Sequence, residues 1–210
     1  MMLPKVDQTE EATERERHMF ELVGLEQSML NNYPHQFSVG QRQRGGRGRA
    51  MALKPELVIA DEAVSALDVS VQAQVMNLML ELQQEMGLSY LFISHDLAVV
   101  ERIAHRVAVM YLGRIVERAA VRPLLKTPRH PYTRGLLYSL PSLTTLSGRL
   151  PSIPGNVPSP FEVPPGCPFH PRCQYFQAGR CDVGEPPELR DLDEAGVDTR
   201  KVACHRAEEI

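Results

Sequence analysis

The sequence lacks three features that would each place the chain in a broad class. None of its apolar stretches is long enough to cross a bilayer, so we expect any link to a membrane to come through a partner. The formal net charge is only −3 at pH 7, which argues against general binding of nucleic acid. No cysteine precedes Cys167 and the first residues show no signal-peptide core, so we do not expect a secreted disulfide framework.

The sequence also has no Gly-Lys pair, and hence no G-x-x-x-x-G-K-[ST] loop. In nucleotide-binding proteins that loop holds the β- and γ-phosphates through backbone N–H groups and the lysine. Other segments nevertheless suit a triphosphate, and they read Ser38-Val39-Gly40-Gln41, Asp61-Glu62 and Ser94-His95-Asp96. We therefore expect a nucleotide site whose main phosphate clamp comes from elsewhere.

The spacing of apolar residues predicts an α/β domain built on a parallel sheet. Short apolar runs typical of buried strands lie at 57–60, 90–93 and 107–111, and a turn at 112–114 leads into 115–118. Helical spacing is found at 7–23, 71–86 and 97–104. Ser38 opens a further helix that should run to about residue 53, with Gln41 completing a capping box. The proline-rich stretch 123–165 is interpreted as an extended connection.

Asp61 and Glu62 follow the apolar run 57–60, where an α/β sheet places its ligand crevice. An aspartate there can hold Mg²⁺ through water, and the next glutamate can polarise an attacking water molecule. The first turn of the helix after Ser38 offers free N–H groups and the positive end of a helix dipole to a phosphate. Both segments therefore predict contacts to a nucleotide.

In this order the segments resemble the signature, Walker B, D-loop and switch-histidine motifs of ABC-transporter ATPases. Ser38-Val39-Gly40-Gln41 resembles the S-G-G-Q signature, with Val39 where the family has a glycine that permits close approach. Ser65-Ala66-Leu67-Asp68 resembles the D-loop, and Tyr33-Pro34-His35-Gln36-Phe37 is similar to the peptide-importer branch. The resemblance implies that ATP and Mg²⁺ are bound by Ser38, Val39, Gly40, Gln41, Asp61 and Asp68, and that Glu62 and His95 are catalytic.

The implied fold is α/β: a partial P-loop NTPase sheet with a remnant of the helical subdomain and a loop-rich, cysteine-containing extension. The helical subdomain and signature would occupy 1–45, the region from Walker B to the switch histidine 46–120, and the extension 121–210.

The helix after the signature departs from the family pattern. Gly45 and Gly48 replace larger residues, and each interior glycine costs about 1 kcal/mol relative to alanine. Arg47 stands where the family has an apolar residue facing the core. A rival interpretation takes Arg42, Arg44, Arg47 and Arg49 as an RGG-type RNA-binding segment. The absence of neighbouring aromatic residues and the negative net charge argue against it, so we expect no nucleic-acid partner.

Cysteines occur only near the end of the chain, at Cys167, Cys173, Cys181 and Cys204. Four thiolates in a segment poor in apolar residues could hold an iron–sulfur cluster or zinc, although the C-x₂-C spacing of simple zinc sites is absent. This tail resembles the C-terminal extension of oligopeptide and dipeptide importer ATPases, which implies a 4Fe-4S cluster with zinc as the alternative. The alternative to a metal site is four free thiols in a disordered tail.

The resemblance implies an ATP-binding subunit that couples ATP binding and hydrolysis to peptide import. Its partners would be a second ATPase subunit, two permease subunits and an extracytoplasmic peptide-binding protein, at the cytoplasmic face of the membrane. Because the phosphate loop is missing, we expect a truncated or split product that does not hydrolyse ATP alone. The alternatives are a nonfunctional remnant, or a cluster-bearing regulatory or interaction protein without ATPase activity.

Overall fold

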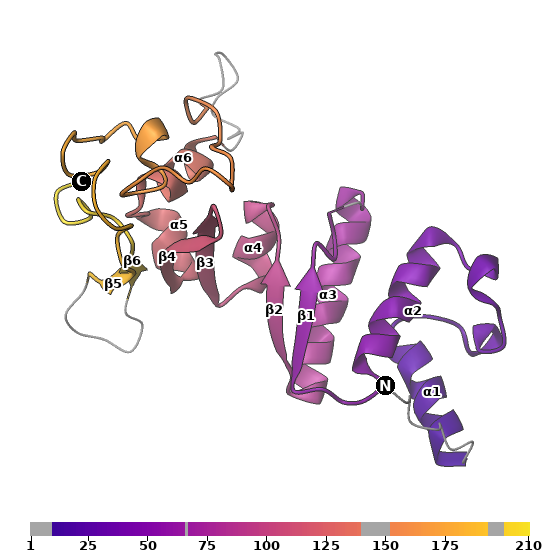
Figure 1. Cartoon of the computed structure of the whole chain (residues 1–210). Helices are drawn as coiled ribbons and strands as arrows, with labels where there is room; N and C mark the ends of the chain where they lie inside the picture. Colours follow the sequence, from indigo (N-terminus) through magenta and orange to yellow (C-terminus); the bar gives the residue numbers. More distant parts are fainter. Residues whose placement is uncertain (1–9, 66, 140–151, 193–199) are drawn as a thin grey trace. The chain divides into compact units, whose positions relative to one another are not determined.

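A computed structural model describes residues 10–65, 67–139, 152–192 and 200–210 (Figure 1). The chain divides into two compact units, residues 1–95 and residues 96–210. The domain boundary that the sequence places at residue 120 is a different division and stays a prediction. In the described parts of the chain, no helix has both the length and the apolar character needed to cross a membrane.

The first unit opens with two helices, α1 (Glu10–Leu22) and α2 (Val39–Met51), joined through the short 3₁₀ turns η1 (Gln27–Met29) and η2 (Pro34–Gln36). The α2 helix forms along its whole length despite its glycines. Gly48 of α2 lies beside Val23, the residue after α1, and a Cβ at Gly48 would lie 3.6 Å from the Val23 methyl groups, an ordinary van der Waals contact. The side chain of Arg47, which stands where the family has an apolar residue facing the core, lies outside the described residues.

The rest of the first unit is a β-α-β element made of β1 (Leu57–Asp61), α3 (Val69–Met86) and β2 (Ser89–Ile93). The two strands are parallel, with Ile59 opposite Leu91 and Asp61 opposite Ile93. Gly87 ends α3 in the left-handed region at φ 64°, which lets the chain reverse into β2 within two residues. The α/β fold with a parallel sheet is thus confirmed.

The second unit begins with α4 (Leu97–Ile103) and the hairpin of β3 (Arg106–Tyr111) and β4 (Arg114–Ala120). The alternation of strands and helices along the sequence predicted that β3 lies in the parallel sheet. Instead, β3 pairs antiparallel with β4, in a second sheet whose strand order is β3-β4-β6-β5. The tight turn at Leu112 and Gly113, both at positive φ, brings the chain straight back and explains the difference.

Two helices lie in the stretch that the sequence suggested to be an extended connection, α5 (Val121–Lys126) and α6 (Pro131–Tyr138). That part of the prediction was wrong. Pro123 lies in the first turn of α5 and Pro131 in the first turn of α6, where the missing N–H does no harm. The side chain of Leu124 in α5 is completely buried, so this region contributes to the core of the second unit.

The tail folds onto the hairpin. The short strands β5 (Arg190–Asp191) and β6 (Lys201–Val202) extend the sheet beyond β4, and η3 (His170–Arg172) follows a buried Phe169. Phe169 stacks edge-on against Tyr111 of β3, with ring centroids 5.3 Å apart. Buried Arg200 donates to the carbonyl oxygens of Pro123 (2.7 Å) and Thr127 (2.6 Å), which fastens β6 to α5.

Candidate functional site

Glu62 and His95 meet at the carboxyl ends of the two parallel strands. The Nδ1 atom of His95 lies 3.3 Å from Oε1 of Glu62, and both side chains are more than half exposed. Asp61 is the last residue of β1 and pairs with Ile93, so its exposed carboxylate lies at the same edge. The structure therefore brings together the two predicted catalytic residues, and places the predicted Mg²⁺ ligand next to them.

The backbone of Glu62 is held in an unusual shape. Its φ of 46° lies in the left-handed region, which non-glycine residues rarely adopt. Its N–H donates to the Ile93 carbonyl at 3.0 Å, and its own carbonyl accepts from the Ser65 hydroxyl at 3.0 Å. These bonds on both sides fix the turn that points the Glu62 carboxylate toward His95.

The signature segment forms the start of α2 as the sequence predicted. The Ser38 hydroxyl accepts from the Gln41 N–H at 3.2 Å, and the Gln41 side-chain oxygen accepts from the Ser38 N–H at 2.9 Å. A Cβ at Gly40 would meet nothing within 4 Å, so this first turn is open to an incoming group. The side chain of Val39, which we expected to weaken a phosphate contact, lies outside the described residues.

A cavity of about 300 Å³ opens between the start of α2 and α3. It is lined by Ser38, Gly40, Gln41, Arg44, Gln74 and neighbouring residues of α3. Arg44 spans it, donating to the Gly24 carbonyl at 3.2 Å and to the Gln74 side chain at 3.5 Å. Asp61, Glu62 and His95 are not among its lining residues, so the signature segment and the strand-end carboxylates form two separate surfaces of the first unit.

Asp68, predicted to bind nucleotide, has a structural task as well. It is the N-cap of α3, and its Oδ1 accepts from the Val71 N–H at 3.0 Å. Its carboxylate is exposed, which leaves oxygen lone pairs free for a further partner. Its role toward a nucleotide stays a prediction.

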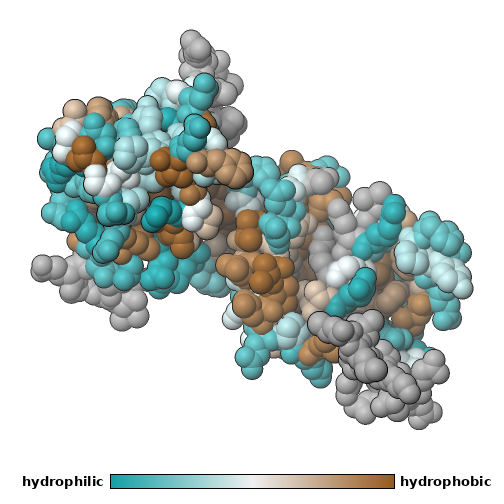
Figure 2. Space-filling model, viewed as in Figure 1, coloured by the Kyte–Doolittle hydropathy of each residue, from teal (hydrophilic) through white to brown (hydrophobic). Residues whose placement is uncertain are grey.

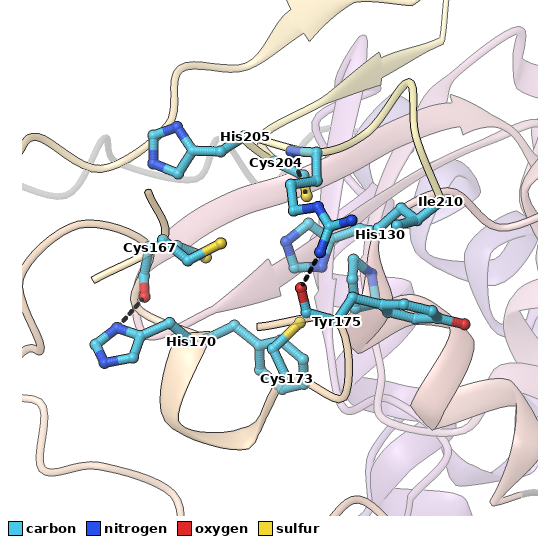
Figure 3. A pocket seen from close by; sticks show the side chains of 12 residues that line it. His130, Cys167, His170, Cys173, Tyr175, Cys204, His205 and Ile210 are labelled. Atoms are coloured by element: carbon cyan, nitrogen blue, oxygen red, sulfur yellow. Dashed lines mark hydrogen bonds between the residues drawn. The ribbon is translucent and has the colours of Figure 1, made fainter. Parts of the chain in front are cut away.

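The four cysteines lie together in the second unit and line one small cavity with His130, His170 and His205 (Figure 3). All four are free thiols; Cys167, Cys181 and Cys204 are buried, and Cys173 is half-buried. Burial raises the pKa of Cys167 to about 12, partly opposed by the Phe169 N–H. Burial likewise raises the pKa of Cys173 and of Cys204.

These surroundings contradict the expected iron–sulfur cluster. Within the described ranges no group of three or more His, Cys, Asp or Glu side chains could hold a metal ion. The cavity measures about 10 Å³, which is room for about one water molecule and far too little for four iron atoms. The predicted 4Fe-4S or zinc site is therefore wrong, and a cluster-bearing regulatory protein loses its basis.

Sequence reasoning missed the buried polar residues that shape the second unit. Glu117 of β4 is fully buried, and its carboxylate accepts the N–H groups of Arg129 and His130 at 2.9 Å each. His130 caps α6 by accepting from the Tyr132 N–H at 3.1 Å, and burial lowers its pKa to about 4. The one available sign was an acidic residue that follows the apolar pair Ile115 and Val116 in β4.

Comparison with known proteins agrees with these motifs. Residues 116–181 match the family described as "Oligopeptide/dipeptide transporter, C-terminal region". The chain is 54% identical, over 87% of its length and 50% of the relative, to a probable peptide ABC transporter ATP-binding protein of Sinorhizobium fredii. It is 53% identical to an oligopeptide transport ATP-binding protein of Bacillus subtilis, over 93% of this chain and 58% of the relative. It is 51% identical to a dipeptide transport ATP-binding protein of Escherichia coli, over 87% of this chain and 54% of the relative.

Solved structures with the same fold include an ATP-binding cassette of an ABC transporter in its ADP conformation, at a TM-score of 0.54 and 22% identity. That match covers 63% of this chain and 53% of the cassette. Another is cbiO1 of Clostridium perfringens, at a TM-score of 0.50 and 24% identity. That match covers 61% of this chain and 54% of cbiO1. This chain therefore belongs to the family of ATP-binding proteins of peptide-type ABC transporters, and it spans about half the length of the curated relatives it matches.

Proposed function

We propose that this chain supplies the signature, Walker B, D-loop and switch-histidine part of an ATP-binding cassette that drives peptide import. The observation that carries the proposal is the contact of Glu62 with His95 at 3.3 Å, at the ends of adjacent parallel strands. The relatives' names, which include peptide, dipeptide and oligopeptide transport, support peptides as the transported solute.

The side chains at the strand ends suit hydrolysis of a phosphoanhydride. Exposed carboxylates are the oxygen ligands that Mg²⁺ prefers, and Asp61 would hold the ion through water. Mg²⁺ neutralises charge on phosphate oxygens when bound. The Glu62 carboxylate polarises the attacking water, and the His95 imidazole, held against it, contacts the γ-phosphate and reports its loss.

The signature surface acts on a different nucleotide. Ser38 and Gly40 present the open first turn of α2 to ATP held by a second ATP-binding subunit, because N–H groups and the helix dipole attract phosphate there. The other proposed partners are a pair of permease subunits and an extracytoplasmic peptide-binding protein. In this proposal the protein acts peripherally at the cytoplasmic face of the membrane, and its 210 residues do not hydrolyse ATP unaided because they carry no phosphate loop.

An ATPase assay tests the proposal with two proteins, the 210-residue chain alone and a chimera. In the chimera, this chain is joined to the part of the Escherichia coli dipeptide relative that it does not span. We expect no phosphate release from the chain alone and clear turnover from the chimera. Glu62→Gln should then reduce turnover about 100-fold or more, because it removes the group that polarises water.

Glu85→Gln is the matched control, since Glu85 is an exposed glutamate on α3 far along the helix from the strand ends. It should leave turnover unchanged. Turnover by the chain alone that Glu62→Gln abolishes would contradict the need for an external phosphate loop. A chimera that folds, binds ATP and shows no turnover would indicate a nonfunctional remnant instead.

A further inference from the structure

The cavity between α2 and α3 holds a cation without an anionic partner. Arg44 spans this cavity of about 300 Å³, is half-buried, and forms no ion pair with any carboxylate in the described part of the chain. Its guanidinium donates only to neutral groups, the Gly24 carbonyl at 3.2 Å and the Gln74 side chain at 3.5 Å. A guanidinium has five N–H donors, so further donors remain for a ligand. A half-buried cation with spare donors favours a bound anion.

Two amide side chains line the same cavity. The side-chain oxygen of Gln41 already accepts from the Ser38 N–H at 2.9 Å, and that of Gln74 accepts from Arg44. The NH₂ group of each glutamine is therefore the part that can donate to a ligand. Such donors suit the carbonyl oxygen of a peptide group or a second oxygen of an anion.

The wall that α3 contributes is partly apolar. Val71 and Val75 line the cavity; Val75 is buried and Val71 is half-buried. An alkyl group placed against them would lose contact with water, which is favourable. Figure 2 shows the hydrophobic surface of the first unit gathered over β1 and β2, whereas hydrophilic residues prevail over α2. The cavity thus combines a short apolar wall with polar surroundings.

This lining selects among small anions. One guanidinium balances the single charge of a carboxylate, and its planar fork matches the two carboxylate oxygens. A dianionic phosphate would need a second cation, and Arg44 is the one charged residue in the described lining. A volume of about 300 Å³ is at the small end for organic ligands. The cavity therefore fits a small carboxylate that also carries an amide group and a short alkyl side chain.

We propose that this cavity binds the carboxyl-terminal end of a di- or tripeptide, with the terminal carboxylate on Arg44. The NH₂ groups of Gln41 and Gln74 donate to the carbonyl oxygen of the last peptide group. The terminal side chain lies against Val71 and Val75. The inference rests on the proposed function, because peptide import delivers ligands of this kind to the protein.

The position of the cavity gives the bound peptide a regulatory effect. Ser38 and Gly40 line the same cavity, and the proposed function assigns their helix turn to the nucleotide of a second subunit. A peptide held on Arg44 would lie beside that turn and obstruct the approach of the nucleotide. Imported product would then oppose the use of ATP.

A titration of the 210-residue chain with alanyl-leucine tests the site without nucleotide. Amide chemical shifts in nuclear magnetic resonance spectra follow the binding, and we expect saturable changes at 24, 38–44 and 71–75. A ligand of this size at ordinary efficiency binds with a Kd of about 1 mM. Alanyl-leucinamide, which has no carboxylate, should bind about 10-fold more weakly, and inorganic phosphate should not saturate in the same range.

Arg44→Gln should weaken the binding of alanyl-leucine about 10-fold, because the neutral amide removes the charge that faces the carboxylate. Arg49→Gln is the matched control, since Arg49 is an exposed arginine of the same helix and does not line the cavity. It should leave the Kd unchanged. Gln74→Ala alters an exposed side chain of α3 and should weaken binding about 5-fold. Circular dichroism of each variant checks that the chain stays folded.

Equal binding of alanyl-leucine and its amide, or by the Arg44→Gln and unaltered chains, would overturn the peptide site. Saturation by phosphate at these amides with no response to the peptide would overturn it as well. The ATPase assay of the chimera separates the two proposals. Turnover by the chimera without peptide binding by the chain removes the peptide site alone. Peptide binding that depends on Arg44, without turnover by the chimera, supports the site and removes the proposed function.

Discussion

Replacing the interior glycines of α2 should stabilise the first unit. Gly45 and Gly48 lie in the helix with ordinary space around them. A Cβ at Gly45 would lie 3.9 Å from Leu25, and one at Gly48 would lie 3.6 Å from the Val23 methyl groups. Each glycine costs about 1 kcal/mol relative to alanine in a helix interior, so Gly45→Ala with Gly48→Ala should gain about 2 kcal/mol.

Amide exchange along α2 measures this gain locally. About 2 kcal/mol corresponds to roughly 25-fold slower exchange of the helix amides through local opening. Gly24→Ala is the opposing control, because Gly24 has φ 66° and a Cβ there would lie 2.7 Å from the Arg44 guanidinium. It should speed exchange. Unchanged or faster exchange in the double variant would refute the reasoning and show that α2 is limited by its packing rather than by glycine.

Three predictions concern the second unit and are checked by urea unfolding. Burial keeps His130 neutral with a pKa of about 4, whereas the unfolded chain protonates it near 6.5. The contribution of neutral His130 to the free energy of unfolding is complete above pH 6.5 and falls by about 3 kcal/mol as the pH drops to 4. His130→Asn keeps a helix cap and should remove that part of the pH dependence. Glu117→Leu leaves two buried N–H groups unpaired and should cost about 3 kcal/mol, with Glu117→Gln costing less. Gly166→Ala should destabilise the second unit far more than Gly179→Ala, which should cost about 1 kcal/mol. Both glycines have positive φ, but only a Cβ at Gly166 would collide with a backbone carbonyl oxygen, at 2.6 Å. An unchanged pH dependence in His130→Asn would contradict the first expectation. Equal urea midpoints for the two Glu117 variants, or for the two glycine variants, would contradict the second or the third.

Local features were predictable from the sequence because their causes are local. The capping box of Ser38 and Gln41 needs only two residues three apart, and it forms as expected. The meeting of Glu62 and His95 followed from two apolar runs that each end in a polar residue, since parallel neighbours end at one edge of a sheet.

Long-range features were not predictable in the same way. The pairing of β6 with β4 joins residues 117 and 202, and no local pattern specifies it. Cysteine spacing suggested a metal site, but spacing does not report how deeply Cys167 is buried or how small the enclosed cavity is. The number of prolines suggested an extended connection. Two of them, however, lie in the first turns of α5 and α6, where proline is compatible with a helix.

The left-handed backbone at Glu62 has a consequence for directed evolution of this chain. A non-glycine residue in that conformation is penalised by about 1–2 kcal/mol, and a glycine there is not. A library screened for thermal tolerance alone should therefore enrich Glu62→Gly, which relaxes the turn and deletes the carboxylate beside His95. Selection for heat resistance at position 62 would therefore lower phosphate release from ATP.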